Sequence, residues 1–103
     1  GEWEEAEALY RRAVAADPAR AQAHKALGDA LYRRGLYDDA AAAYRAATER
    51  DPELGDDVYF KLGNIAYKQG DRTQAVAFWR KALELNPENQ VVRTNLELVE
   101  AMA

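Results

Sequence analysis

The chain of 103 residues has no cysteine, which excludes disulfides and thiolate metal sites. It has a single histidine, His24, whereas a metal centre needs several converging ligands. The glycines stand singly, so there is no glycine-rich phosphate loop. The longest apolar stretches are short and alanine-rich, well below the ~20 residues that span a membrane. We therefore expect no metal, no cofactor and no membrane contact from this chain.

Charge of one sign is not concentrated anywhere. The net charge is −4, from 14 basic and 18 acidic residues that are interspersed along the chain. A basic footprint for nucleic acid is absent, so we expect no nucleic-acid partner. The acidic pairs, such as Asp38-Asp39 and Asp56-Asp57, stand near expected helix N-termini, where they complement the helix dipole. A general acid/base pair needs a water-poor pocket that nothing here implies, so we predict no catalytic residues and no enzyme.

The same residue types recur along the chain at a step of about 34. Asp17-Pro18 and Asp51-Pro52 lie 34 residues apart, and Asn86-Pro87 follows after 35. The same step is kept by sets of small and aromatic residues: Gly1, Gly35 and Gly70; Ala6, Ala40 and Ala75; Tyr10, Tyr44 and Trp79; Ala13, Ala47 and Ala82. A fixed period of this size is typical of a stacked repeat array.

Apolar residues between the glycine and proline breaks follow helical spacing, as in Tyr59, Leu62 and Ala66. We predict six helices, over residues 2–16, 21–34, 37–50, 56–69, 72–85 and 88–101. Gly35 and Gly70 are suited to the left-handed conformation that ends a helix. Asp38 and Asp71 are placed to cap the next helix or complement its dipole.

This pattern resembles the tetratricopeptide repeat (TPR). The best matching unit reads Tyr59, Leu62-Gly63, Tyr67, Gly70, Ala75, Trp79, Ala82 and Pro87. The unit before it reads His24, Leu27-Gly28, Leu31-Tyr32, Gly35, Ala40, Tyr44, Ala47 and Pro52. The first unit has only the second helix of a repeat, with Trp3, Ala6, Tyr10, Ala13 and Pro18. The resemblance implies an all-α, right-handed superhelical solenoid of antiparallel helix pairs.

The resemblance also implies a division of this single domain. Residues 1–20 form the second helix of an incomplete repeat, 21–54 and 56–89 form full repeats, and 90–103 form a C-terminal capping helix. Gly55 reads as a one-residue insertion that lengthens one loop. Glu97 stands where a repeat has glycine, which favours a cap, although the last helix can alternatively start another repeat.

Each recurring residue has an expected packing role. Gly28 and Gly63 let the second helix of a pair approach closely. We expect Tyr10, Tyr44 and Trp79 to fill the space between successive pairs. His24 replaces an aromatic ring, so a packed or half-exposed imidazole is expected there. Arg72 replaces the aromatic residue held by Trp3 and Tyr37 at the equivalent positions.

The N-terminal helix lacks a preceding partner, because the chain starts at Gly1 in the middle of a repeat. We expect the chain to be a piece of a longer protein. The exposed apolar face, with Trp3, Leu9 and Val14 as candidates, predicts some self-association.

In the TPR family the first helices of successive pairs line a concave groove. The resemblance therefore implies a partner-binding groove formed by Gln22, Lys25, Asp29, Tyr32, Arg33, Asp57, Phe60, Asn64, Tyr67 and Lys68, with Val91, Thr94 and Leu98 added by the last helix. Aromatic residues beside charged ones suit a peptide. Tyr32 and Tyr67 can equally serve inter-helix packing, whereas Phe60 has no evident intramolecular use.

Some members of the family clamp the C-terminal carboxylate of heat-shock chaperones with lysine, asparagine and arginine residues. Lys25 matches the first clamp position, but Asp29 and Lys61 stand where asparagines are needed. Val91 and Asn95 replace the last lysine and arginine, so we do not expect this binding.

The sequence thus predicts a non-catalytic protein-binding module whose partner is an unidentified protein or peptide. The alternative is a structural, self-assembling scaffold that joins copies of a larger protein. We expect a cytoplasmic location for this chain, and its alanine and arginine content suggests a bacterial source.

Overall fold

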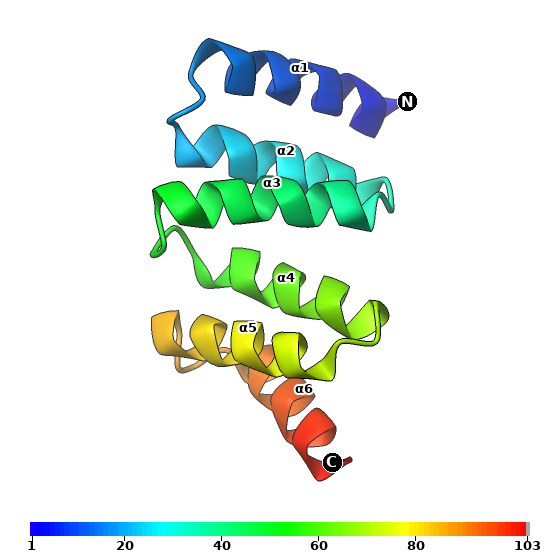
Figure 1. Ribbon diagram of the computed structural model, residues 1–103, viewed down its shortest axis with the longest axis vertical. Coiled ribbons are helices and arrows are strands. Elements are labelled where there is room, and N and C mark those ends of the chain that lie inside the picture. Colours follow the sequence, from blue (N-terminus) through cyan, green and yellow to red (C-terminus); the bar gives the residue numbers. More distant parts are fainter. Residues whose placement is uncertain (103) are drawn as a thin grey trace. The chain divides into compact units, whose positions relative to one another are not determined.

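The computed structural model describes residues 1–102, which form six α-helices and no strand (Figure 1). The helices are α1 (Glu2–Ala16), α2 (Ala21–Arg33), α3 (Tyr37–Arg50), α4 (Asp56–Lys68), α5 (Arg72–Leu85) and α6 (Gln90–Ala101). The predicted all-α class is confirmed. The differences are small: α2 and α4 end one residue earlier than expected, and α6 begins two residues later. None of these helices has the length and apolar character needed to cross a membrane.

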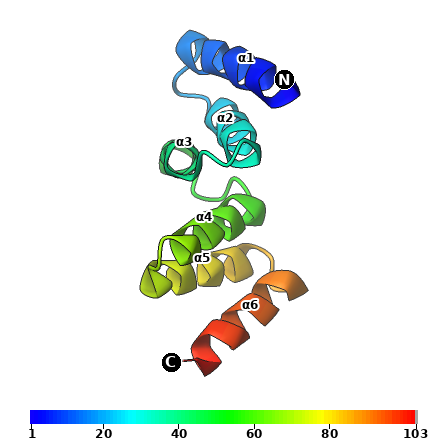
Figure 2. The same cartoon turned by 90° about the vertical axis from the view of Figure 1, so that its right-hand side faces the viewer.

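The helices form two compact units. Unit 1 covers Gly1–Leu54 and holds α1 to α3, and unit 2 begins at Gly55 and holds α4 to α6. In each unit, helices that follow one another along the chain pack side by side (Figures 1 and 2). The boundary falls where the repeats 21–54 and 56–89 were expected to meet. The loop there, residues 51–55, is one residue longer than the loops at 17–20 and 86–89, as Gly55 predicted.

A glycine ends the first helix of each pair, Gly35 after α2 and Gly70 after α4. Gly35 has φ 76°, and its N–H donates to the Tyr32 carbonyl at 3.0 Å. The next N–H, that of Leu36, donates to the Leu31 carbonyl at 3.0 Å. This is the Schellman arrangement, which satisfies carbonyls that the helix leaves without partners. The same two bonds close α4 around Gly70, which has φ 81°.

Polar side chains set where two of the helices begin. The Asp71 side chain accepts a hydrogen bond from the Gln74 N–H at 3.0 Å, which confirms its predicted capping role. The Asn89 side chain accepts from the Val92 N–H at 3.2 Å. This second cap explains why α6 begins at Gln90 rather than at residue 88. Asp38 lies in the first turn of α3, where its charge complements the dipole.

The closest helix contacts join an aromatic ring to a glycine. A Cβ added to Gly28 would lie 2.6 Å from the Cδ1 and Cε1 atoms of Tyr44, which is fully buried. A Cβ on Gly63 would overlap the indole of Trp79, which is 3% exposed. The expected close approach is therefore confirmed. The rings, however, pack within a pair, α2 with α3 and α4 with α5, and the expectation that they fill the space between pairs was wrong.

Small residues complete these contacts. The alanines that flank each ring along α3 and α5 are fully buried: Ala40, Ala47, Ala75 and Ala82. Without larger side chains, the two backbones of a pair can lie close enough for the ring to reach the glycine. The remaining core of each unit is mainly aliphatic, with Tyr59 also buried in unit 2. It includes Leu27, Ala30 and Leu31 in unit 1 and Val58, Leu62, Ile65, Val92 and Leu96 in unit 2.

None of the residues of helix α1 is fully buried, and charged side chains contribute to its contact with α2. The Glu7 carboxylate pairs with Arg11 at 2.8 Å on the same helix and with Arg34 beyond the end of α2. The hydrogen bonds from Arg11 and Arg34 lower the pKa of Glu7. The Arg33 guanidinium lies over the Trp3 ring, 5.3 Å from its centroid. Val14 is half-buried, so the expectation that it lies on the exposed face was wrong.

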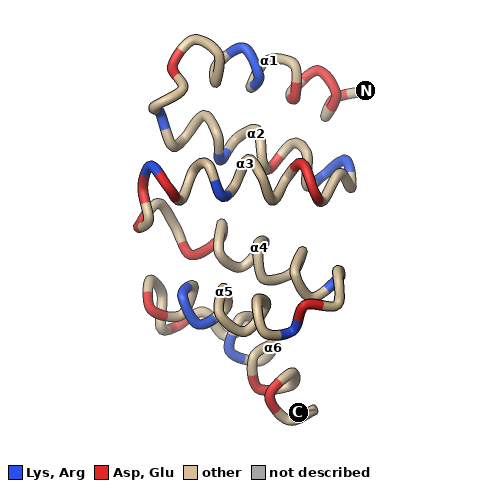
Figure 3. The backbone as a smooth tube through the Cα atoms, viewed as in Figure 1, with Lys and Arg blue, Asp and Glu red and all other residues tan. Residues whose placement is uncertain are grey.

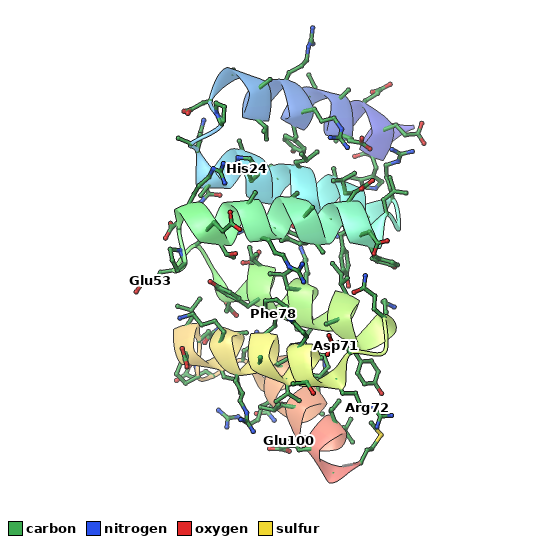
Figure 4. All side chains as sticks on the ribbon, in the orientation of Figure 1. His24, Glu53, Asp71, Arg72, Phe78 and Glu100 are labelled. Atoms are coloured by element: carbon green, nitrogen blue, oxygen red, sulfur yellow. The ribbon has the colours of Figure 1, made fainter. Side chains whose placement is uncertain are left out.

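The Pro18 carbonyl ties the first loop to two helices. It accepts a hydrogen bond from His24 Nε2 at 2.8 Å and another from Arg50 Nε at 2.5 Å. His24, labelled on α2 in Figure 4, is 7% exposed. The expected packed imidazole is thus confirmed, and its hydrogen bond satisfies a buried polar group.

The glycine contacts predict a cost for any side chain at these positions. Gly28→Leu should lower the free energy of unfolding by roughly 1–3 kcal/mol, because the added atoms meet the Tyr44 ring. Chemical denaturation followed by circular dichroism measures this. Ala42→Leu, at an exposed position of α3, is the matched control and should be near neutral. Equal stability of the two variants would contradict the close packing.

The Glu7 ion pairs predict a pH dependence. The folded-state pKa of Glu7 lies below its ordinary value of 4.5. Its stabilising contribution is therefore complete above about pH 4.5 and is lost as the pH falls through the lowered pKa. Glu7→Gln should be less stable than the parent at pH 7, and the difference should shrink as the pH falls below 4.5. Denaturation over a series of pH values tests this, with Glu49→Gln on α3 as control. A difference that stays constant down to the lowest pH at which the protein folds would exclude the charge mechanism.

Candidate functional site

The predicted groove residues of unit 2 share one face of α4. Spacings of three and four residues keep them on one side of a helix. They are Asp57, Phe60, Asn64, Tyr67 and Lys68. Tyr67 is 40% exposed and Lys68 is also exposed, whereas Asp57, Phe60 and Asn64 are half-buried. The face thus offers two aromatic rings with polar groups between and beside them.

Tyr67 serves both packing and surface. Its ring centroid lies 6.0 Å from that of Trp79, with the planes tilted by 35°. Its 40% exposure nevertheless leaves much of the ring open to solvent. The backbone carbonyl of Phe60 accepts a hydrogen bond from Trp79 Nε1 at 3.2 Å, which links α4 to α5. The half-buried phenyl ring stays partly accessible.

The equivalent face of α2 in unit 1 is also engaged within the molecule. Its predicted residues are Gln22, Lys25, Asp29, Tyr32 and Arg33. The Tyr44 hydroxyl donates to Asp29 Oδ1 at 2.6 Å. Tyr32 packs edge-on against Tyr37 at 5.4 Å, and Arg33 lies over Trp3. Three of the five residues therefore contribute to packing, and their freedom to reorient toward a ligand is reduced.

Helix α6 carries an exposed apolar row at the same repeat positions. Val91 is 60% exposed, Leu98 is 61% exposed and Met102, just after the helix, is 50% exposed. Thr94 lies between them on the same side. The register position of Met102 was missed by the sequence analysis, although it follows Leu98 at a spacing of four.

A second feature of unit 2 was not predicted from sequence. A hollow between α5 and α6 is lined by Arg72, Thr73, Val76, Ala77, Arg80, Val99 and Glu100. Arg80 Nη2 and Glu100 Oε2 form an ion pair across it at 2.6 Å. Figure 4 labels Arg72 and Glu100, which belong to α5 and α6. The available signal was Arg72, which stands where the other units have an aromatic ring.

A side-chain cluster that could hold a metal ion is not seen in residues 1–102. No group of three or more histidine, cysteine, aspartate or glutamate side chains converges there. Each helix carries both basic and acidic residues (Figure 3). Every buried side-chain nitrogen or oxygen in the described part of the chain has a hydrogen-bond partner. The arrangement offers contact surfaces built from aromatic, aliphatic and charged side chains.

Family models described as tetratricopeptide repeat match residues 1–54 and residues 56–89. The chain belongs to the tetratricopeptide repeat family. The TPR fold commonly mediates protein–protein interaction. No curated protein matches the chain by sequence.

Solved structures place the helices of this TPR chain among TPR solenoids. The Yersinia enterocolitica type III secretion chaperone SycD, in complex with a peptide of the translocator YopD, is 19% identical with a TM-score of 0.90, over 99% of this chain and 82% of SycD. MamA is 22% identical with a TM-score of 0.88, over 96% of this chain and 57% of MamA. YrrB, described as a TPR protein with an unusual peptide-binding site, is 23% identical with a TM-score of 0.81, over 92% and 48%. These similarities show the fold.

The hydrogen bond between Tyr44 on α3 and Asp29 on α2 predicts that the Tyr44 hydroxyl stabilises the fold modestly. Tyr44→Phe should lower the free energy of unfolding by about 1 kcal/mol, because it removes one hydrogen bond and keeps the ring on Gly28. Thermal and chemical denaturation measure the change. Tyr10→Phe, at a partly exposed ring of α1, is the matched control and should have little effect. Equal effects would mean that the hydroxyl of Tyr44 contributes nothing specific.

Proposed function

We propose that this TPR chain is a non-catalytic protein-binding module that holds a peptide or partner segment on its first-helix faces. The observation that carries the proposal is the face of α4. There, the half-buried Phe60 and the exposed Tyr67 stand beside Asn64 and Lys68. Aromatic rings that are partly open to solvent supply contact area, and an amide can bond a peptide backbone. On this view α2 contributes a charged contact, chiefly through Lys25.

The known TPR structures support this proposal. SycD was solved with a peptide of YopD, and YrrB is described as having a peptide-binding site. Binding of an extended or helical segment by this chain should be of micromolar strength, because ordering a flexible ligand costs several kcal/mol. We place the activity in the cytoplasm.

The heat-shock-protein tail is not the proposed ligand. Asp29 occupies a position where a carboxylate clamp needs a neutral donor, and its negative charge repels a C-terminal carboxylate. The Tyr44 hydroxyl bond also holds the Asp29 side chain in place on this face. The partner segment is instead expected to present apolar side chains to α4.

A scaffold that joins copies of the protein is the second candidate. It is favoured by the exposed apolar residues of α1, Trp3 at 40% and Leu9 at 60%. This function requires higher-order species without any partner, and cross-linking of the parent protein reveals them. A protein that remains monomeric at high concentration would exclude it.

The proposed binding faces of α2 and α4 are tested with peptides that the unsubstituted chain selects from a displayed library of random sequences. Phe60→Ala combined with Lys25→Ala should raise the Kd of the selected peptides at least about tenfold, a loss of about 1.4 kcal/mol or more. Isothermal calorimetry measures the Kd, and circular dichroism checks that helicity is intact. The matched control is Leu36→Ala with Arg45→Ala, an exposed apolar and basic pair of unit 1 outside the proposed binding faces. Unchanged binding by the variant with Phe60→Ala and Lys25→Ala would refute the proposed faces.

A further inference from the structure

The hollow between α5 and α6 has the size of a small-molecule site. Its volume is about 480 Å³, and pockets that hold small ligands usually lie between about 300 and 1,000 Å³. Along α5 it is lined by Arg72, Val76 and Arg80, spaced four residues apart, with Thr73 and Ala77 beside them. From the first arginine to the second the helix rises about 12 Å, because each residue adds about 1.5 Å. The hollow is therefore short, about two helical turns in length.

The interior of the hollow is apolar. Val99 of α6 is 7% exposed, and Val76 of α5 is half-buried. Ala77 and Thr73 are small and exposed, so they leave space above the valines. Thr73 is the only uncharged polar side chain in the lining. A hydrocarbon chain would gain free energy by leaving water for such a surface.

The two ends of the hollow differ in charge. At one end, Arg80 Nη2 and Glu100 Oε2 form an ion pair at 2.6 Å that bridges α5 and α6. At the other end, the Arg72 side chain has no hydrogen bond or ion pair within residues 1–102. The neighbouring Asp71 is not part of the lining, and its carboxylate accepts a hydrogen bond from the Gln74 N–H. The uncompensated charge of the lining is thus positive and lies at Arg72 (Figure 4).

These features define the chemistry of an occupant. A peptide segment or a sugar would bring several polar groups into the hollow, and Thr73 alone could not satisfy them. An occupant with one negative charge and one hydrocarbon chain leaves no polar group unpaired. An extended chain of roughly ten carbons spans the about 12 Å between the two arginines.

We propose that the hollow binds a free straight-chain monocarboxylate of about eight to ten carbons. The carboxylate pairs with Arg72, and the hydrocarbon chain lies over Ala77 and the two valines. The methyl end stops at the ion pair of Arg80 and Glu100, where the glutamate repels a second carboxylate. This site lies on α5 and α6, apart from the faces of α2 and α4 proposed for peptides, so either proposal can fail without the other.

The direct experiment is a titration of the isotope-labelled protein with decanoate at pH 7, followed by NMR. We expect saturable shifts of backbone amides within 72–80 and 99–100. Ala77→Phe places a ring in the hollow and should remove these shifts. The matched control is Ala42→Phe, at the equivalent exposed position of α3, which should leave the Kd unchanged. Shifts that do not saturate, or that survive Ala77→Phe, would overturn the proposal.

The role of Arg72 is tested by removing its charge. Arg72→Gln should raise the Kd of decanoate at least about threefold, the size of effect expected for an exposed ion pair. Arg45→Gln, at an exposed position of α3, removes the same charge and should have no effect. Equal Kd values for the two variants would contradict the proposed contact.

Decanedioate, which has a carboxylate at both ends, tests the other end of the hollow. In Glu100→Gln, Arg80 loses its partner and becomes available to the second carboxylate. The ratio of the Kd of decanedioate to that of decanoate should therefore fall at least about threefold relative to the parent. Glu97→Gln, at an exposed position of α6, makes the same change in net charge and should leave the ratio unchanged. The same ratio in Glu100→Gln and the parent would overturn the proposal.

Discussion

The fold depends on one contact, made twice: an aromatic ring of the second helix lying on a glycine of the first. Tyr44 on Gly28 and Trp79 on Gly63 bring two backbones so close that one methyl group would not fit between them. The alanines beside each ring permit this approach, and the polar atom of each ring bonds to the opposite helix. The two helix pairs, α2 with α3 and α4 with α5, therefore share the same close packing.

Much of this fold was predictable from the sequence because the same residue types recur at equivalent positions of each repeat. The recurring glycines identified Gly35 and Gly70 as helix ends, and the resemblance to the tetratricopeptide repeat identified Gly28 and Gly63 as close-approach positions. The location of the rings within a pair rather than between pairs was missed. Periodicity gives the position of a residue in the repeat, but it does not give the direction in which a side chain points, since that depends on how the helices cross.

The candidate site was less predictable. Five residues on α4 do share one face, as helical spacing required. The partial use of Asp29, Tyr32 and Arg33 in packing was not visible, because each has its partner on another helix: Tyr44, Tyr37 or Trp3. Contacts of this kind arise only after the chain has folded. The hollow beside Arg72 was missed for a related reason. The sequence shows that an aromatic ring is absent at this position, but it does not show whether neighbouring side chains fill the space.

The two tryptophans lie in opposite surroundings, one in each unit. Trp79 is 3% exposed and its indole nitrogen is bonded to a carbonyl, whereas Trp3 is 40% exposed beneath a guanidinium. Native emission is therefore the sum of a shielded, short-wavelength component and a wetter, longer-wavelength one that acrylamide reaches first. Stability in repeat proteins is approximately a sum of local terms, so the halves of such a chain need not melt together. This chain carries a built-in optical reporter for each half, with no added label.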